Sequence, residues 1–188
     1  LAEGTWYWRV VARDQDNYIS GPSATRSVII DVTRPQATVT VDTDPIYSGD
    51  RAQLVTVSYT ESMNNATAPV ITFAQSAHWG LQTGGAWSTT TYADDTYTAT
   101  FTHDGTAEYI ANETASVANA SGAEDLATND EFGDSSPAFV IDTAAPTIQS
   151  ATTQDNDGAG NVDRAVIVFN EPVDDSTLVV SGFTIGGV

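Results

Sequence analysis

An internal repeat is the feature that most constrains the fold of this chain of 188 residues. The segment IDVTRP at residues 30–35 recurs as IDTAAP at residues 141–146. Two further features follow both copies in the same order: an acidic loop and a turn that contains glutamate. The matching ranges are 42–52 with 155–165 and 59–64 with 169–174. The chain is therefore expected to hold one complete module of about 110 residues and the beginning of another.

Alternating apolar and hydroxyl residues predict β-strands, because successive side chains of a strand point to opposite faces. The predicted strands cover residues 39–41, 54–59, 70–73, 97–101 and 138–141. No window of about 11 residues has the apolar spacing of a helix. Short strands with Gly, Asn and Asp in their connections predict an all-β fold of tandem β-sandwiches.

The charge of the chain excludes several classes of partner. Its 25 acidic residues face only six cationic ones, all arginine and widely spaced, so the net charge is −19. Nucleic acids and anionic membrane surfaces require clustered Lys and Arg, and we expect neither as a partner. No apolar run approaches the roughly 18 residues of a membrane span. Cysteine is absent, which excludes disulfides and Cys-ligated zinc.

Residues 1–12 have the spacing L-x-x-G-T-x-Y-x-x-V-x-A, which resembles the penultimate strand of a fibronectin type III domain. Tyr7 stands where such a domain has its tyrosine corner. The Asp-Thr-x-x-Pro linker, the glutamate turn and the segment GGAWS at residues 84–88 resemble tandem Ig-like repeats of giant prokaryotic cell-surface proteins.

The resemblance implies three parts within a longer polypeptide. They are residues 1–34, the last strands of a truncated fibronectin type III-like domain; residues 35–145, a complete Ig-like β-sandwich; and residues 146–188, the start of a further Ig-like domain.

The strongest chemical signal is a D-x-D-G-x-G-x-x-D loop at residues 155–163. Its candidate calcium ligands are Asp155, Asp157, Asn161 and Asp163. Calcium takes about six to eight oxygen ligands from a tightly turning chain, and glycine permits such turns. The loop is not an EF-hand, because alignment on Gly158 puts Thr153 at the first ligand position and Arg164 at the last. The alternative is a solvated turn, since Asp, Asn and Gly favour turns without any ion.

The matching loop of the first repeat offers Asp42, Asp44 and Asp50 as calcium ligands, but it has Pro45 and no glycine pair. In an Ig-like sandwich this loop lies at the pole of the exit linker.

The linker itself contains Asp142, and the next module presents Glu171 and Asp174. We therefore expect these carboxylates to converge with the loop on one calcium ion, which would remove a hinge. An ordinary flexible linker is the alternative.

Catalytic and sugar-binding interpretations are weaker. His78 and His103 are the only histidines, and a Ser-His-Asp combination would arise by chance from the many serines and aspartates. We therefore expect no enzyme and no catalytic residues. Trp79, Trp87 and Tyr92 flank a glycine-rich connection and present either a stacking platform for sugars or ordinary core packing.

Asn65, Asn112 and Asn119 match the N-glycosylation pattern, although about two matches are expected by chance. Together these features predict a secreted structural component of a prokaryotic cell surface. Its partners would be copies of itself or neighbouring domains of the same chain, as in a surface layer or filament coat. The alternatives are the extender stalk of an adhesin and a carbohydrate-binding accessory module of a secreted enzyme, whose partners would be glycans.

Overall fold

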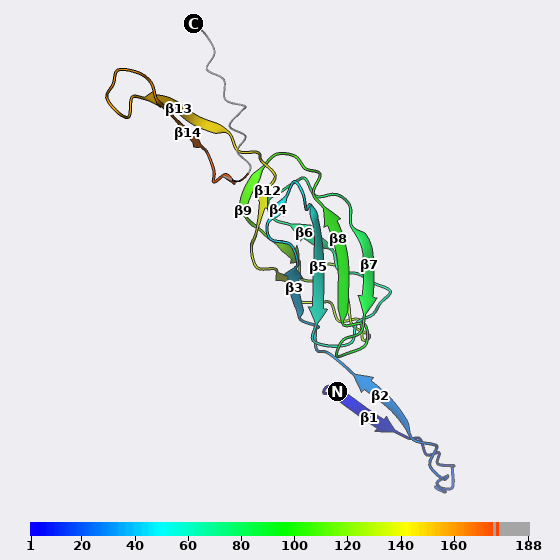
Figure 1. Cartoon of the computed structure of the whole chain (residues 1–188). Helices are drawn as coiled ribbons and strands as arrows, with labels where there is room; N and C mark the ends of the chain where they lie inside the picture. The colour runs from blue at the N-terminus through cyan, green and yellow to red at the C-terminus, as the bar shows by residue number, and fades with distance from the viewer. Residues whose placement is uncertain (175, 177–188) are drawn as a thin grey trace. The chain divides into compact units, whose positions relative to one another are not determined.

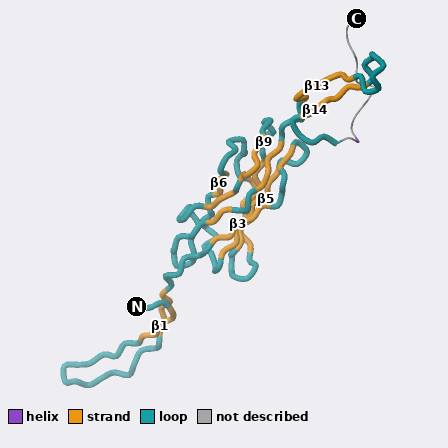
Figure 2. The backbone as a smooth tube through the Cα atoms, turned by 90° about the vertical axis from the view of Figure 1, so that its left-hand side faces the viewer, coloured by secondary structure: helices purple, strands orange, loops and turns teal. Residues whose placement is uncertain are grey.

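The computed structural model describes residues 1–174 and 176, as strands joined by turns and long loops (Figures 1 and 2). The all-β prediction is confirmed, and all five predicted strands are present within two residues of their expected bounds. No α-helix, and so no helix able to cross a membrane, occurs among the described residues. The chain divides into two compact units, Leu1–Thr143 and Ala144–Val188.

The first unit begins with an antiparallel ribbon of two strands, β1 (Gly4–Trp8) and β2 (Arg26–Ile30). Trp6 lies opposite Val28, and Trp8 lies opposite Arg26. Two strands alone cannot bury a face, and these tryptophans remain 42% and 50% exposed.

A four-stranded antiparallel sheet has the order β3-β5-β8-β7. Its strands are β3 (Ala37–Val41), β5 (Ala52–Tyr59), β7 (Thr83–Ser88) and β8 (Thr96–Thr102). The strict alternation of β5 puts Val55, Val57 and Tyr59 on one buried face, as the period-two pattern predicts.

Two smaller sheets complete the first unit. The first has the order β11-β10-β6 and the second the order β4-β12-β9, in which β4 and β12 pair in parallel. Their strands are β4 (Ile46–Tyr47), β6 (Ile71–Phe73), β9 (Tyr109–Glu113), β10 (Ala115–Val117), β11 (Asp134–Ser135) and β12 (Phe139–Asp142).

The main core joins the four-stranded sheet to the sheet of β6 and β10, because Val57 and Tyr59 share one cluster with Ile71 and Val117. A smaller cluster contains Ile46, Phe139 and Ile141 of the third sheet. Phe73 and Trp79 pack against both clusters, so one continuous apolar layer holds the sheets together.

Three buried carboxylates, Asp95, Glu113 and Glu131, each accept hydrogen bonds from backbone amides. Their amide donors are Thr90, Thr91 and Tyr92 for Asp95; Ala74, Gln75, Ser76 and Thr114 for Glu113; and Ser121 and Ala123 for Glu131. Glu131 also accepts the hydroxyl of Tyr59 at 2.5 Å. The amides of Tyr92, Thr90 and Thr91 lower the pKa of Asp95, and their bonds to this carboxylate close the turn before β8.

The second unit begins with β13 (Ile148–Gln154) and β14 (Arg164–Phe169), an antiparallel pair joined by the acidic loop at residues 155–163. The remainder of the further domain predicted at residues 146–188, namely residue 175 and residues 177–188, lies outside the described residues.

Candidate metal centre

Three carboxylates from distant segments meet in the first unit. Asp31, Glu61 and Asp125 each bring one oxygen atom within 4.8 Å of the others. Asp31 follows β2 directly, Glu61 follows β5, and Asp125 lies in the loop between β10 and β11. The fold therefore ties the end of the ribbon to two turns of the central sheets.

Arg34 anchors the segment that holds Asp31. Its Nε and Nη2 atoms donate hydrogen bonds of 2.7 Å to the carbonyl oxygens of Asp130 and Glu131. The side-chain amide of Asn129 donates to the carbonyl oxygen of Asp31 at 3.3 Å. These contacts fix the chain after β2 against the loop that contains Asp125.

Asp125 is 1% exposed and organises its own turn. Its Oδ1 atom accepts the amides of Ala127 at 2.7 Å and Asn129 at 2.9 Å. Its Oδ2 atom accepts the Asn129 side chain at 2.8 Å, and one lone pair of that oxygen stays available.

Glu61 is the unusual member of the cluster. Its Oε1 atom is buried and has no hydrogen-bond partner. Burial, followed by the negative charges of Asp125, Asp31 and Glu3, raises the pKa of Glu61 to about 7. A buried, unpartnered carboxylate oxygen beside two like charges is costly, and a bound cation would offset that cost.

The cluster fits a hard divalent cation. Oxygen ligands lie about 2.3–2.6 Å from calcium, so two ligands on opposite sides of one ion are about 5 Å apart. The 4.8 Å limit that contains the three oxygens is compatible with that geometry. Carboxylates supply only part of the shell, and carbonyl oxygens or water would complete it.

Sequence reasoning missed this cluster, although a signal for two of its members was present. Asp31 and Glu61 occupy the repeat positions of Asp142 and Glu171, which were predicted as ligands one module later. The repeat therefore also marks Asp31 and Glu61 as candidate ligands at the first linker. Asp125 has no such signal, because its approach depends on the path of a loop far along the chain.

The loop at residues 155–163 brings Asp155, Asp157 and Asp163 together within 4.8 Å, while Asn161 lies exposed in the same loop. Their oxygens already cap amides of the loop. The donors are Gly158 and Gly160 for Asp155, Ala159 for Asp157 and Asn156 for Asp163. The amide of Gly160 is the main cause of the lowered pKa of Asp155. Gly158 and Gly160 have φ angles of 74° and 85°, which explains the glycines.

Asp42 and Asp44 also accept hydrogen bonds from backbone amides. Asp42 Oδ1 accepts the amide of Leu54 at 2.9 Å, and Asp44 Oδ1 accepts the amide of Val140 at 3.0 Å. These two and Asp50 do not form one of the close carboxylate groups found in residues 1–174 and 176. An ion in this loop stays a prediction.

The predicted junction ligands fall in different units. Asp142 ends β12 in the first unit, whereas Glu171 and Asp174 lie in the second. Buried side-chain atoms without a partner are few among the described residues: Glu61 Oε1, Trp79 Nε1, Asp142 Oδ1 and Glu171 Oε1. Glu61 and Glu171, at equivalent repeat positions, thus each have a buried Oε1 atom without a hydrogen-bond partner. An ion shared with Asp142 stays a prediction.

The buried His103 belongs to a hydrogen-bond network. Its Nδ1 atom accepts the amide of Gly105 at 3.1 Å, so its Nε2 atom carries the proton and donates to Glu108 Oε1 at 2.6 Å. Ser76 Oγ donates to the same Glu108 oxygen at 2.6 Å and lies 3.4 Å from His103 Nε2. In this arrangement His103 has no free lone pair with which to accept the serine proton.

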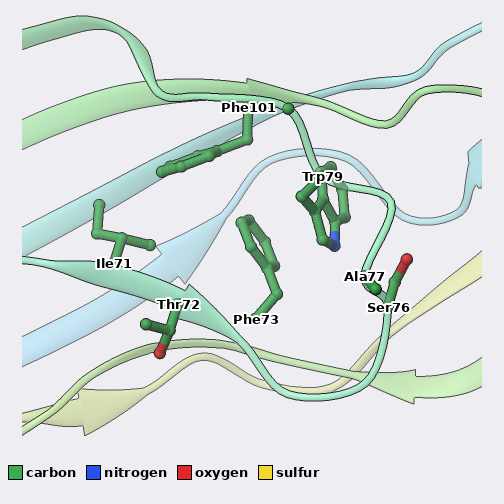
Figure 3. Close-up of a pocket in the computed structure, with 8 residues that line it drawn as sticks. Ile71, Thr72, Phe73, Ser76, Ala77, Trp79 and Phe101 are labelled. Carbon is green, nitrogen blue, oxygen red and sulfur yellow. The ribbon is translucent and has the colours of Figure 1, made fainter.

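The aromatic residues near the glycine-rich connection mostly pack inward. The rings of Trp79 and Phe73 stack with centroids 4.2 Å apart, and both line a pocket of about 260 Å³ together with Phe101 (Figure 3). Trp87 packs against the main core, and only Tyr92 is largely exposed. These contacts favour packing over a flat sugar platform.

The three glycosylation candidates are all exposed. Asn65 donates through Nδ2 to Asp94 at 3.0 Å, and Asn119 accepts the amide of Gly133 through Oδ1 at 2.8 Å. Asn112 lies on β9. Modification of these asparagines stays a prediction.

Comparison with protein-family models, with curated proteins and with solved structures finds no significant match.

Proposed function

We propose that this chain is a structural segment of a secreted prokaryotic cell-surface protein, a surface layer or filament coat, in which bound calcium stiffens tandem modules. The central sheets that share one core would form the Ig-like sandwich, and the ribbon would be the end of a fibronectin type III-like domain. The repeat and the acidic clusters support this proposal. The partners would be copies of the chain or neighbouring modules, and no catalytic role is included.

The observation that carries the proposal is the buried, unpartnered Oε1 atom of Glu61 beside Asp31 and Asp125. A calcium ion there would join the end of one module to two turns of the next. The cross-link would resist bending and extension at the linker, where a tandem protein is otherwise most compliant. The same orphan oxygen at Glu171 suggests that each linker of the array uses this device.

Thermal melting with calcium and then with chelator tests the proposal. Extracellular calcium modules have dissociation constants of about 0.1–1 mM, and a hundredfold excess over that constant adds about 2.7 kcal/mol to the unfolding free energy. We expect the Glu61→Gln variant to lose this increment and to retain its fold.

The control is a double variant, Asp155→Asn with Asp157→Asn. It neutralises two carboxylates of the other acidic loop, whereas Glu61→Gln neutralises one in the Glu61 cluster. It should keep the response of the Glu61 cluster. If the double variant alone abolishes the calcium effect, the ion binds at residues 155–163 and the Glu61 site is wrong. No effect on the wild-type chain would contradict the calcium role altogether.

An adhesin stalk is the second candidate, because the same linker site would stiffen it. Light scattering separates the two functions. A coat protein should grow into large assemblies when calcium is added, whereas a stalk segment should stay monomeric and only become more rigid.

A further inference from the structure

The loop at residues 103–108 holds the last residue of the first unit, Thr143. The amide of Thr143 donates to the carbonyl oxygen of Glu108 at 3.0 Å, and the amide of Glu108 donates to Thr143 Oγ1 at 3.1 Å. Thr143 Oγ1 donates in turn to the carbonyl oxygen of Thr106 at 2.6 Å. Three hydrogen bonds therefore clamp the start of the linker.

The shape of this loop depends on one neutral histidine. His103 is fully buried, and its two ring nitrogens have opposite roles. Nδ1 accepts the amide of Gly105, whereas Nε2 donates to Glu108. Gly105 has a φ angle of 90°, a backbone conformation that residues with a side chain rarely adopt.

We propose that His103 makes this loop an acid-sensitive clamp on the linker. Uptake of one proton from solvent at Nδ1 puts an N–H group against the N–H of Gly105, and the hydrogen bond between them is lost. The peptide of Gly105 must then turn away, which displaces Thr106 and frees Thr143. The clamp therefore opens when acidification charges the ring.

Charged groups surround the ring on several sides. Glu108 pairs with Nε2 and keeps the ring in place, so protonation acts on the Nδ1 side. His78 lies 5.9 Å away, ring to ring, and pairs with Asp104. Arg51 donates to the carbonyl oxygen of Asp104 at 2.7 Å. A hydrogen bond from the amide of Thr106 is the main cause that lowers the pKa of Asp104 to about 2, so this carboxylate stays charged throughout the range.

Amide hydrogen exchange of the whole chain in chelator tests the clamp. Between pH 7.5 and 5, we expect the protection of the Glu108 and Thr143 amides, corrected for intrinsic rates, to fall by up to about tenfold per pH unit, because one proton is taken up. Unchanged protection would overturn the proposal. The chelator separates this result from the calcium proposal, on which the clamp does not depend.

Two variants identify the group responsible. His103→Asn keeps an acceptor for Gly105 but cannot titrate in this range, so its protection should not fall. His78→Asn should respond as the wild type does. An equal fall in His103→Asn would overturn the proposal and would assign the effect to another group, such as Glu61. If His103→Asn does not fold, nitrogen NMR of wild-type His103 decides, because a proton on Nδ1 at pH 7.5 contradicts the clamp.

Discussion

The two acidic clusters have similar composition but differ in the hydrogen bonding of one member, Glu61. The cluster of Asp31, Glu61 and Asp125 draws its members from three distant segments and keeps one buried oxygen without a partner. The loop at residues 155–163 draws all its carboxylates from one turn, and each caps a nearby amide. Charge density alone does not distinguish them. The useful distinction is whether the chain itself already satisfies the oxygens.

That distinction explains why a sequence motif is an incomplete guide to a metal site. Local Asp and Gly spacing favours a turn in which the carboxylates bond the backbone, whether or not an ion is present. In the tertiary cluster Asp31 and Asp125 also accept nearby amides, but Glu61 keeps one oxygen without a partner, and the three like charges repel one another. The less conspicuous cluster is therefore the better candidate for an ion that the fold needs.

The largest expected difference between the clusters concerns Asp125. Asp125→Ala leaves the part-buried amides of Ala127 and Asn129 without their acceptor, and we expect a loss of about 2–3 kcal/mol of unfolding free energy in urea titrations. Asp155→Ala, the matched change in the exposed loop, should leave the global transition unchanged. Equal losses would show that both clusters are structural in the same way.

A smaller effect is a pH dependence of stability, measured in chelator, that we expect from Glu61 in the first cluster. The pKa of Glu61 is raised to about 7 in the folded protein, so the folded state holds a proton that the unfolded state releases near pH 4.5. This contribution to stability is full below about pH 4.5 and is lost as the pH rises to about 7.

Glu61→Gln should therefore melt like the wild type at pH 5 and be more stable at pH 8, by about 1–2 kcal/mol after allowance for partial exposure. Calcium should reverse the order at pH 8, because only the wild type binds the ion. A variant that is less stable than the wild type at pH 8 in chelator would show that Glu61 is not strained by its neighbours.

The smallest expected effect is local to the second cluster. Asp155→Asn weakens two caps without removing them, so amide exchange at Gly158 and Gly160 should speed up by about threefold to tenfold, with no change in melting. Exchange that is unaffected would show that the glycine conformations, and not the carboxylate, fix the loop.

The long strands of the central sheet were predictable from the sequence, because the apolar residues of β5 and β8 alternate and lie on one buried face. Strands such as β9, β13 and β14 were not among the predicted ranges. The partners of each strand were not predictable. The parallel pairing of β12 with β4 joins segments separated by much of the first unit, and no local pattern specifies it.

The candidate site was predictable to the extent that it repeats. The acidic linker and the glutamate turn pointed to Asp142 and Glu171, and the same pattern holds for Asp31 and Glu61. Asp125 could not be predicted, because its position depends on the anchoring of residues 34–37 against residues 129–132.

The amide-bonded carboxylates Asp95, Glu113 and Glu131 have a consequence for the solvent in which the protein works best. Dissolved electrolyte does not reach these buried groups, so it does not weaken their bonds. The ion pairs of the described residues both involve histidine, so little attraction is lost to screening. Repulsion within the net charge of −19 is screened instead. We expect the folded chain to be more stable in seawater or brine than in fresh water.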